Sequence, residues 1–72
     1  MALDTAMKEV RVNGETVRTS APTLAHILAE LGYAGRKVAT ALNGEFVPAS
    51  GRDRMPLAPG DRIEVVAPRQ GG

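Results

Sequence analysis

The sequence contains no cysteine and no tryptophan, and His26 is its only histidine. Without cysteine no disulfide can form, and a single histidine does not supply the ligands of a structural zinc site. Tyr33 and Phe46 are the only aromatic residues, too few for a surface that stacks nucleic-acid bases. The lack of cysteine is compatible with a reducing cytosol, and the domain must be stabilised by packing alone.

An excess of one charge and long apolar runs are also missing. Nine Lys and Arg residues against eight Asp and Glu residues give a net charge of +1, so there is no basic stripe for nucleic acid. No apolar run approaches the ~20 residues of a membrane span. Residues 1–6 lack the regions of a signal peptide. We therefore expect a soluble, cytoplasmic protein with neither nucleic acid nor membrane as a partner.

The 72 residues are enough for one small domain, which buries only about 60% of the surface of its unfolded chain. We expect three parts: a disordered lead-in over residues 1–6, a folded domain over 7–66, and a flexible tail over 67–72. A chain of this length has no second domain with which to form an active-site cleft.

Two Asn-Gly pairs predict two antiparallel hairpins, because a type I′ turn needs a positive φ at both central positions. The pairs are Asn13-Gly14 and Asn43-Gly44, and we interpret both as turn chemistry and nothing else. Apolar and polar residues alternate before the first turn, as in a strand with one solvated face. The strands expected around the two turns span residues 7–12 and 15–19, and residues 38–42 and 45–48.

A stripe of apolar residues at helical spacing predicts the helix that covers one face of the sheet. Thr23 is suited to cap its first turn, and Gly32 is suited to end it in a left-handed conformation. His26 lies off the stripe, so we expect a solvated side chain. The stripe consists of Leu24, Ile27, Leu28 and Leu31.

The last third of the chain predicts an irregular connection and then a final strand. Residues 49–56 are polar, with Arg52 expected to be exposed, and Leu57 is a candidate core residue. Residues 58–61 have the Pro-Gly centre of a type II turn. In the strand that follows, Ile63 and Val65 are expected to face one way, and Arg62, Glu64 and Val66 the other way.

This order of elements predicts an α+β domain with a mixed sheet of four to five strands and one main helix on one face. The compact arrangement that we expect is the ubiquitin-like β-grasp, in which the first and last strands lie side by side, parallel, at the centre.

The chain ends in Pro68, Arg69, Gln70, Gly71 and Gly72. Proline blocks further strand pairing, and the glycines have no side chains. Such a thin, flexible tail suits a narrow channel in which a partner enzyme acts on the terminal carboxylate. The alternative is that chain ends often fray and hold glycine without any function.

Five stretches in this order together resemble the ThiS family, the sulfur carrier proteins of thiamine biosynthesis. The resemblance covers residues 7–72. Two features depart from the family pattern: the extension over residues 1–6, and the absence of a tryptophan from residues 49–54. The matching stretches are residues 12–15, 23–33, 38–48, 57–66 and 70–72.

The resemblance implies that an E1-like enzyme uses ATP to adenylate the carboxylate of Gly72. A thiocarboxylate then forms with sulfur from a cysteine desulfurase, and thiazole synthase receives that sulfur. By the same resemblance, Gly71 keeps the tail thin, while Gln70, Arg69 and Pro68 belong to the segment that the partner holds. The chain would be a co-substrate rather than an enzyme, and it would bind no cofactor itself.

A partner-docking surface is expected around Phe46, Arg62 and Val66. Val47 is expected in the core and Phe46 half exposed, and an ordinary contact on the sheet surface is the alternative for Phe46. Three other functions remain open. They are a sulfur carrier for molybdopterin synthesis, a ubiquitin-like modifier conjugated to lysines through Gly72, and a plain interaction module.

Overall fold

The computed structural model describes residues 7–67 of the chain. The predictions for residues 1–6 and for the tail beyond Ala67 therefore lie outside the described residues. In chain order the elements are β1 (Lys8–Val12), β2 (Glu15–Thr19), α1 (Leu24–Glu30), β3 (Ala39–Leu42), β4 (Glu45–Val47), the 3₁₀-helix η1 (Ala49–Arg54) and β5 (Arg62–Val66).

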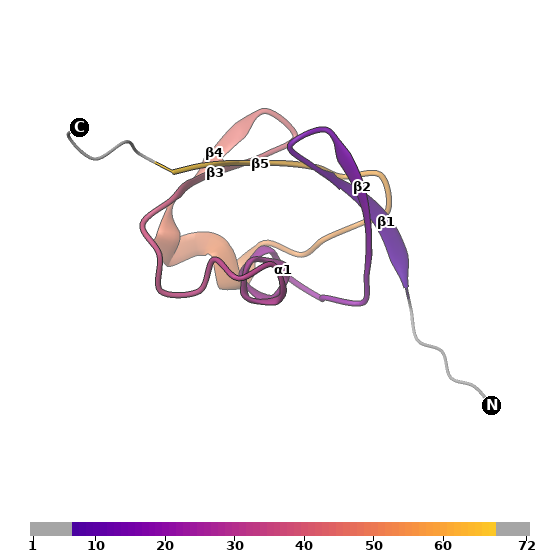
Figure 1. Cartoon of the computed structure of the whole chain (residues 1–72), viewed down its shortest axis with the longest axis horizontal. Helices are drawn as coiled ribbons and strands as arrows, with labels where there is room; N and C mark the ends of the chain where they lie inside the picture. The colour runs from indigo at the N-terminus through magenta and orange to yellow at the C-terminus, as the bar shows by residue number, and fades with distance from the viewer. Residues whose placement is uncertain (1–6, 68–72) are drawn as a thin grey trace.

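The strands form one five-stranded sheet in the order β2-β1-β5-β3-β4, and α1 lies across one face of it (Figure 1). β1 and β5 pair in parallel at the centre, with Arg11 opposite Arg62 and Val12 opposite Ile63. The other neighbouring strands pair antiparallel. The predicted β-grasp arrangement is confirmed.

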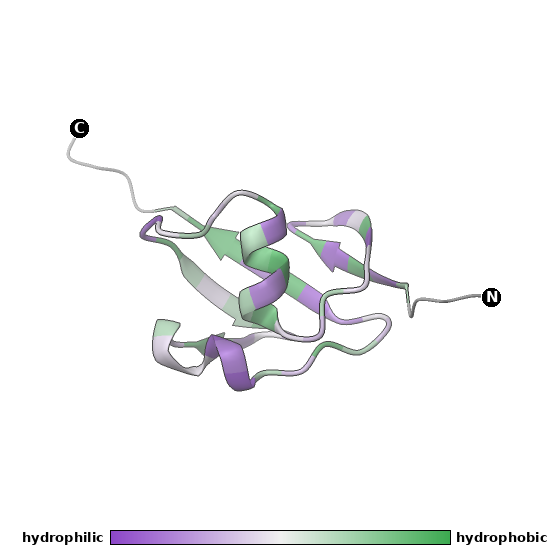
Figure 2. Cartoon of the chain, turned by 90° about the horizontal axis from the view of Figure 1, so that it is seen from below, coloured by the Kyte–Doolittle hydropathy of each residue, from purple (hydrophilic) through white to green (hydrophobic). Residues whose placement is uncertain are grey.

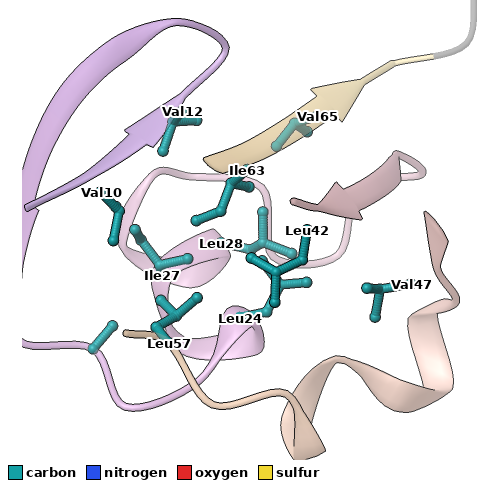
Figure 3. Packing of buried hydrophobic residues seen from close by; sticks show 11 residues of the cluster. Val10, Val12, Leu24, Ile27, Leu28, Leu42, Val47, Leu57, Ile63 and Val65 are labelled. Carbon is teal, nitrogen blue, oxygen red and sulfur yellow. The ribbon is translucent and has the colours of Figure 1, made fainter. Parts of the chain in front are cut away.

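The core lies between α1 and the sheet, and Figure 3 shows side chains from both layers pointing into it. Leu57 packs there too, as predicted from its sequence. In Figure 2, α1 carries hydrophobic and hydrophilic residues in turn, as an amphipathic helix does. The buried hydrophobic residues are Val10, Val12, Ala21, Leu24, Ile27, Leu28, Leu42, Val47, Leu57, Ile63 and Val65.

Both predicted ends of α1 are confirmed. The Thr23 hydroxyl oxygen accepts a hydrogen bond from the backbone N–H of His26 at 3.3 Å. Gly32 has a φ of +90°, and its N–H and that of Tyr33 donate to the carbonyls of Ala29 and Leu28. These two bonds form a Schellman motif, which closes the helix.

Leu31 is not a core residue, so that part of the predicted apolar stripe is wrong. The side chain is 37% exposed, because α1 ends at Glu30 and Leu31 is the C-cap. A periodic pattern in sequence continues past the point at which the backbone leaves the helix.

The connection after β4 is also more ordered than the sequence indicates. Residues Ala49–Arg54 form the 3₁₀-helix η1, and Arg52 is partly buried rather than exposed. Its Nε donates to Thr40 Oγ1 at 3.0 Å and its Nη2 donates to the carbonyl of Val38 at 2.6 Å. Arg52 therefore ties η1 to the segment that forms β3.

Candidate functional site

The site begins with β5, the strand that leads toward the C-terminus. β5 is the middle strand of the sheet, between β1 and β3. Its Ile63 and Val65 are buried in the core, as the alternation predicts. The predicted site residues that follow all lie outside the described residues, so their roles stay predictions. They are Pro68, Arg69, Gln70, Gly71 and Gly72.

An apolar patch lies on the face of the sheet opposite α1, over β3, β4 and the end of β5. Phe46 is 69% exposed and Val66 is 61% exposed. In the strand register Phe46 lies opposite Ala41, and Val66 lies opposite Ala39. We call these four residues the outer apolar patch. The two alanines are small, so they leave the larger side chains of Phe46 and Val66 standing above a low apolar surface.

The pattern of inward and outward residues agrees with the sequence prediction on β4. Val47 is buried and the neighbouring Phe46 is exposed, more so than the half exposure that we expected. A large exposed aromatic side chain on a flat sheet is the kind of residue that anchors a protein partner.

Arg62 lies on the same face as the outer apolar patch but at the start of β5. Its neighbour across the sheet is Arg11 of β1, and Glu64 lies between it and Val66 along the strand. The structure thus places Val66 at the end of β5 that precedes the tail, and Phe46 on β4, level with Glu64 in the middle of β5. It places Arg62 at the opposite end, next to a second arginine.

Neither metal chemistry nor a membrane span is visible in the part of the chain that the structure describes. Residues 7–67 contain no group of three or more metal-ligating side chains, and no helix among them is long and apolar enough to cross a bilayer. The ring Nδ1 of His26 lies 3.2 Å from Thr23 Oγ1 at an exposed position. What the described face offers is an exposed apolar patch that includes the last residue of β5.

Sequence reasoning missed two residues that hold β5. Asn13 and Asn43 have φ values of 52° and 51°, which confirms the left-handed turn conformation. The interpretation that they are turn chemistry and nothing else is wrong. The Asn13 side chain bonds the backbone of Val65, and the Asn43 side chain bonds the N–H of Arg62. In the sequence, only the choice of an amide at both turns could have indicated these contacts.

Comparison with known proteins agrees with this fold. The profile of the ThiS family matches residues 7–72. A thiazole synthase of Paramagnetospirillum magneticum is 42% identical over 62 residues, which cover 85% of this chain and 19% of that protein. The chain thus spans about a fifth of the length of this curated relative.

A solved structure is also similar. The crystal structure of the thiamine biosynthesis protein ThiS from Geobacter metallireducens matches with a TM-score of 0.75 and 25% sequence identity. The match covers 89% of this chain and 99% of that one. By its sequence profile and its β-grasp fold, the chain belongs to the ThiS family of sulfur carriers.

Proposed function

We propose that this chain carries sulfur as a C-terminal thiocarboxylate and donates it for formation of the thiazole ring of thiamine. The family match, which runs through Gly72, is the observation that carries the proposal. The position of β5 also supports the proposal. It is the middle strand of the sheet, its Ile63 and Val65 are buried, and it anchors the chain immediately before the tail.

The chemistry needs an activated carboxylate, because a free carboxylate is a poor electrophile. An oxygen of the Gly72 carboxylate attacks the α-phosphorus of ATP, and pyrophosphate leaves. The terminal sulfur of a persulfide, formed through a cysteine desulfurase, then attacks the acyl carbon, and AMP leaves. A thiol attacks the S–S bond of the resulting acyl disulfide, which releases the thiocarboxylate and leaves the two other sulfurs joined as a disulfide. The chain is a co-substrate in these steps, and the activating partner binds the ATP.

The partners that we infer are an E1-like adenylyltransferase and a thiazole synthase, acting in the cytoplasm. The outer apolar patch and Arg62 form the docking surface for the activating enzyme. An exposed aromatic beside small apolar residues supports this role. One side of the patch, formed by Ala39 and Val66, lies at the end of β5 from which the chain continues toward Gly72.

The likeness to a thiazole synthase supports thiazole formation as the destination of the sulfur. That relative is a much longer protein, so the proposal depends on a free carboxylate at Gly72. The first measurement is therefore the intact mass of the protein, which shows whether the chain ends at that glycine.

The test is incubation with a ThiS-activating E1-like enzyme, ATP and a sulfur source, followed by intact mass analysis. We expect a gain equal to the replacement of one oxygen by sulfur, mapped to the C-terminal peptide. A variant with one extra residue after Gly72 is the control, and it should gain nothing because its carboxylate is displaced. Absence of the gain in the wild-type chain, while a reference carrier is loaded, would contradict the proposal. Isopeptide adducts on cellular proteins would favour the modifier function instead.

A further inference from the structure

β5 extends further toward the C-terminus than its parallel neighbour β1 does. The paired register of β1 and β5 ends with Val12 opposite Ile63, because the chain then turns at Asn13 and Gly14. On the other side, β3 continues to pair with β5 as far as Val66. The final residues of β5 would therefore have a strand on one side only.

The side chain of Asn13 occupies the position that β1 leaves. The backbone N–H of Asn13 donates to the carbonyl of Ile63 at 2.9 Å. Its Oδ1 then accepts from the N–H of Val65 at 2.8 Å, and its Nδ2 donates to the carbonyl of Val65 at 3.2 Å. In a parallel ladder, the next carbonyl and N–H of the neighbouring strand would make these two bonds. The side-chain amide has the same donor and acceptor as a peptide group, so it extends the pairing by one step.

The turn alone does not require this amide. Asn13 has a φ of 52°, a conformation that glycine adopts without strain. Aspartate is also common in such turns, but an ionised carboxylate has no N–H to donate to the carbonyl of Val65. Asparagine is the residue that satisfies both the turn and the two groups of Val65.

The second turn provides a matched comparison within the same chain. Asn43 has nearly the same φ, 51°, and its side chain also bonds β5. Its Oδ1 accepts from the N–H of Arg62 at 2.9 Å and its Nδ2 donates to Asp61 Oδ1 at 3.0 Å. Asn43 therefore holds the start of β5, whereas Asn13 holds the end from which the tail continues.

We propose that Asn13 is a positioning residue for the reaction at Gly72, because its amide holds the β1 side of Val65, next to Val66, where the pairing of β5 with β3 ends. This inference rests on the proposed function. Without the amide, β3 still pairs with β5 as far as Val66, but the N–H and the carbonyl of Val65 lose their two bonds on the β1 side.

Loss of the Asn13 amide affects the reaction through the docking surface. Val66 belongs to the outer apolar patch and follows Val65 directly, so a loose Val65 also loosens part of that patch. The activating enzyme must then order this end of β5 on binding. When this ordering costs the free energy of about one of the two lost hydrogen bonds, KM rises about three- to tenfold, with kcat unchanged once the complex has formed.

The experiment compares Asn13→Gly with Asn43→Gly, since both substitutions keep the turn conformation and remove one side-chain amide from β5. Amide hydrogen exchange is measured at Val65 and Arg62. KM and kcat for the carrier are measured by pyrophosphate release with an E1-like enzyme that adenylates the wild-type chain. We expect Asn13→Gly to speed exchange at Val65 and raise KM about three- to tenfold. We expect Asn43→Gly to speed exchange at Arg62 and to raise KM less than Asn13→Gly does, because the carbonyl of Arg62 keeps its 2.7 Å bond from the backbone N–H of residue 43.

Equal KM changes in the two variants would overturn the inference, and so would an unchanged KM in Asn13→Gly. Should Asn13→Gly not fold, Asn13→Asp serves in its place, since it retains the turn and the acceptor but lacks the donor. Failure of the wild-type chain to be adenylated, while a reference carrier reacts, identifies failure of the proposed function itself. The inference would then fall with that function.

Discussion

Leu28 and Leu31 show how far a single residue can be understood from sequence. Both lie on the same apolar stripe at helical spacing, yet Leu28 is 4% exposed and Leu31 is 37% exposed. The difference arises because the Schellman motif at Gly32 ends the helix first. Periodicity identifies the face of a helix, but only the backbone geometry decides how many residues of that face are buried.

Truncation of these two leucines should therefore have unequal effects. Leu28→Ala removes buried methyl groups and leaves a cavity, so we expect the free energy of unfolding to fall by about 2–5 kcal/mol. Leu31→Ala at the exposed C-cap should lower it by less than about 1 kcal/mol. Urea titration followed by circular dichroism measures both. Equal losses would mean that Leu31 packs into the core in solution.

Asn13 illustrates what residue-level patterns do not contain. The Asn-Gly pair correctly predicts the turn, because the positive φ is a local requirement. The bonds from the side chain to Val65 join residues 52 positions apart. Local sequence does not encode a partner at that distance. Asn13 and Val65 come into contact only because β1 and β5 pair in parallel.

At the scale of elements, the strands and the helix were predictable because each carries a period, two for strands and 3.6 for the helix. The 3₁₀-helix η1 was missed for the same reason. Its six residues are too few for a period, and none of them is buried. What fixes η1 is the guanidinium of Arg52, which bonds Thr40 on β3 and the carbonyl of Val38 just before that strand.

The attachment of η1 can be tested with two arginines from the same element. Arg52→Ala leaves the carbonyl of Val38 without its donor, so we expect a loss of about 1–3 kcal/mol in the free energy of unfolding. The described contact of Arg54 is with the carbonyl of Ser50 within η1, at 3.5 Å. Arg54→Ala should therefore change stability by no more than about 0.5 kcal/mol. Thermal denaturation of both variants measures the difference, and a similar loss in the two would show that Arg52 does not hold η1 to the sheet.

At the scale of the whole molecule, the β-grasp fold leaves the outer apolar patch on one face of the sheet, and α1 covers the other face (Figure 1). The sequence predicted that Phe46 and Val66 face outward, because outward residues alternate with core residues. It did not predict that Arg62 lies at the far end of β5 beside Arg11. Which outward residues become neighbours depends on strand register, and register is fixed by the assembled sheet.

The docking role that we propose for the outer apolar patch leads to a prediction that separates binding from folding. Phe46→Ser removes an exposed ring, so the melting temperature should change by no more than about 4 °C. If the ring anchors the activating enzyme, kcat/KM for adenylation should fall about tenfold or more.

Leu31→Ser is the matched control, since it also replaces an exposed apolar side chain with serine but lies at the end of α1, beyond the opposite face of the sheet. It should leave kcat/KM within about twofold of the wild-type value, as expected for a residue outside the interface. Pyrophosphate release with each carrier as the varied substrate gives the comparison. Equal changes of kcat/KM in Phe46→Ser and Leu31→Ser would mean that the activating enzyme docks elsewhere on the domain. A selective loss at Phe46 would show that the enzyme docks on the face of the sheet where β5 continues toward the reacting glycine.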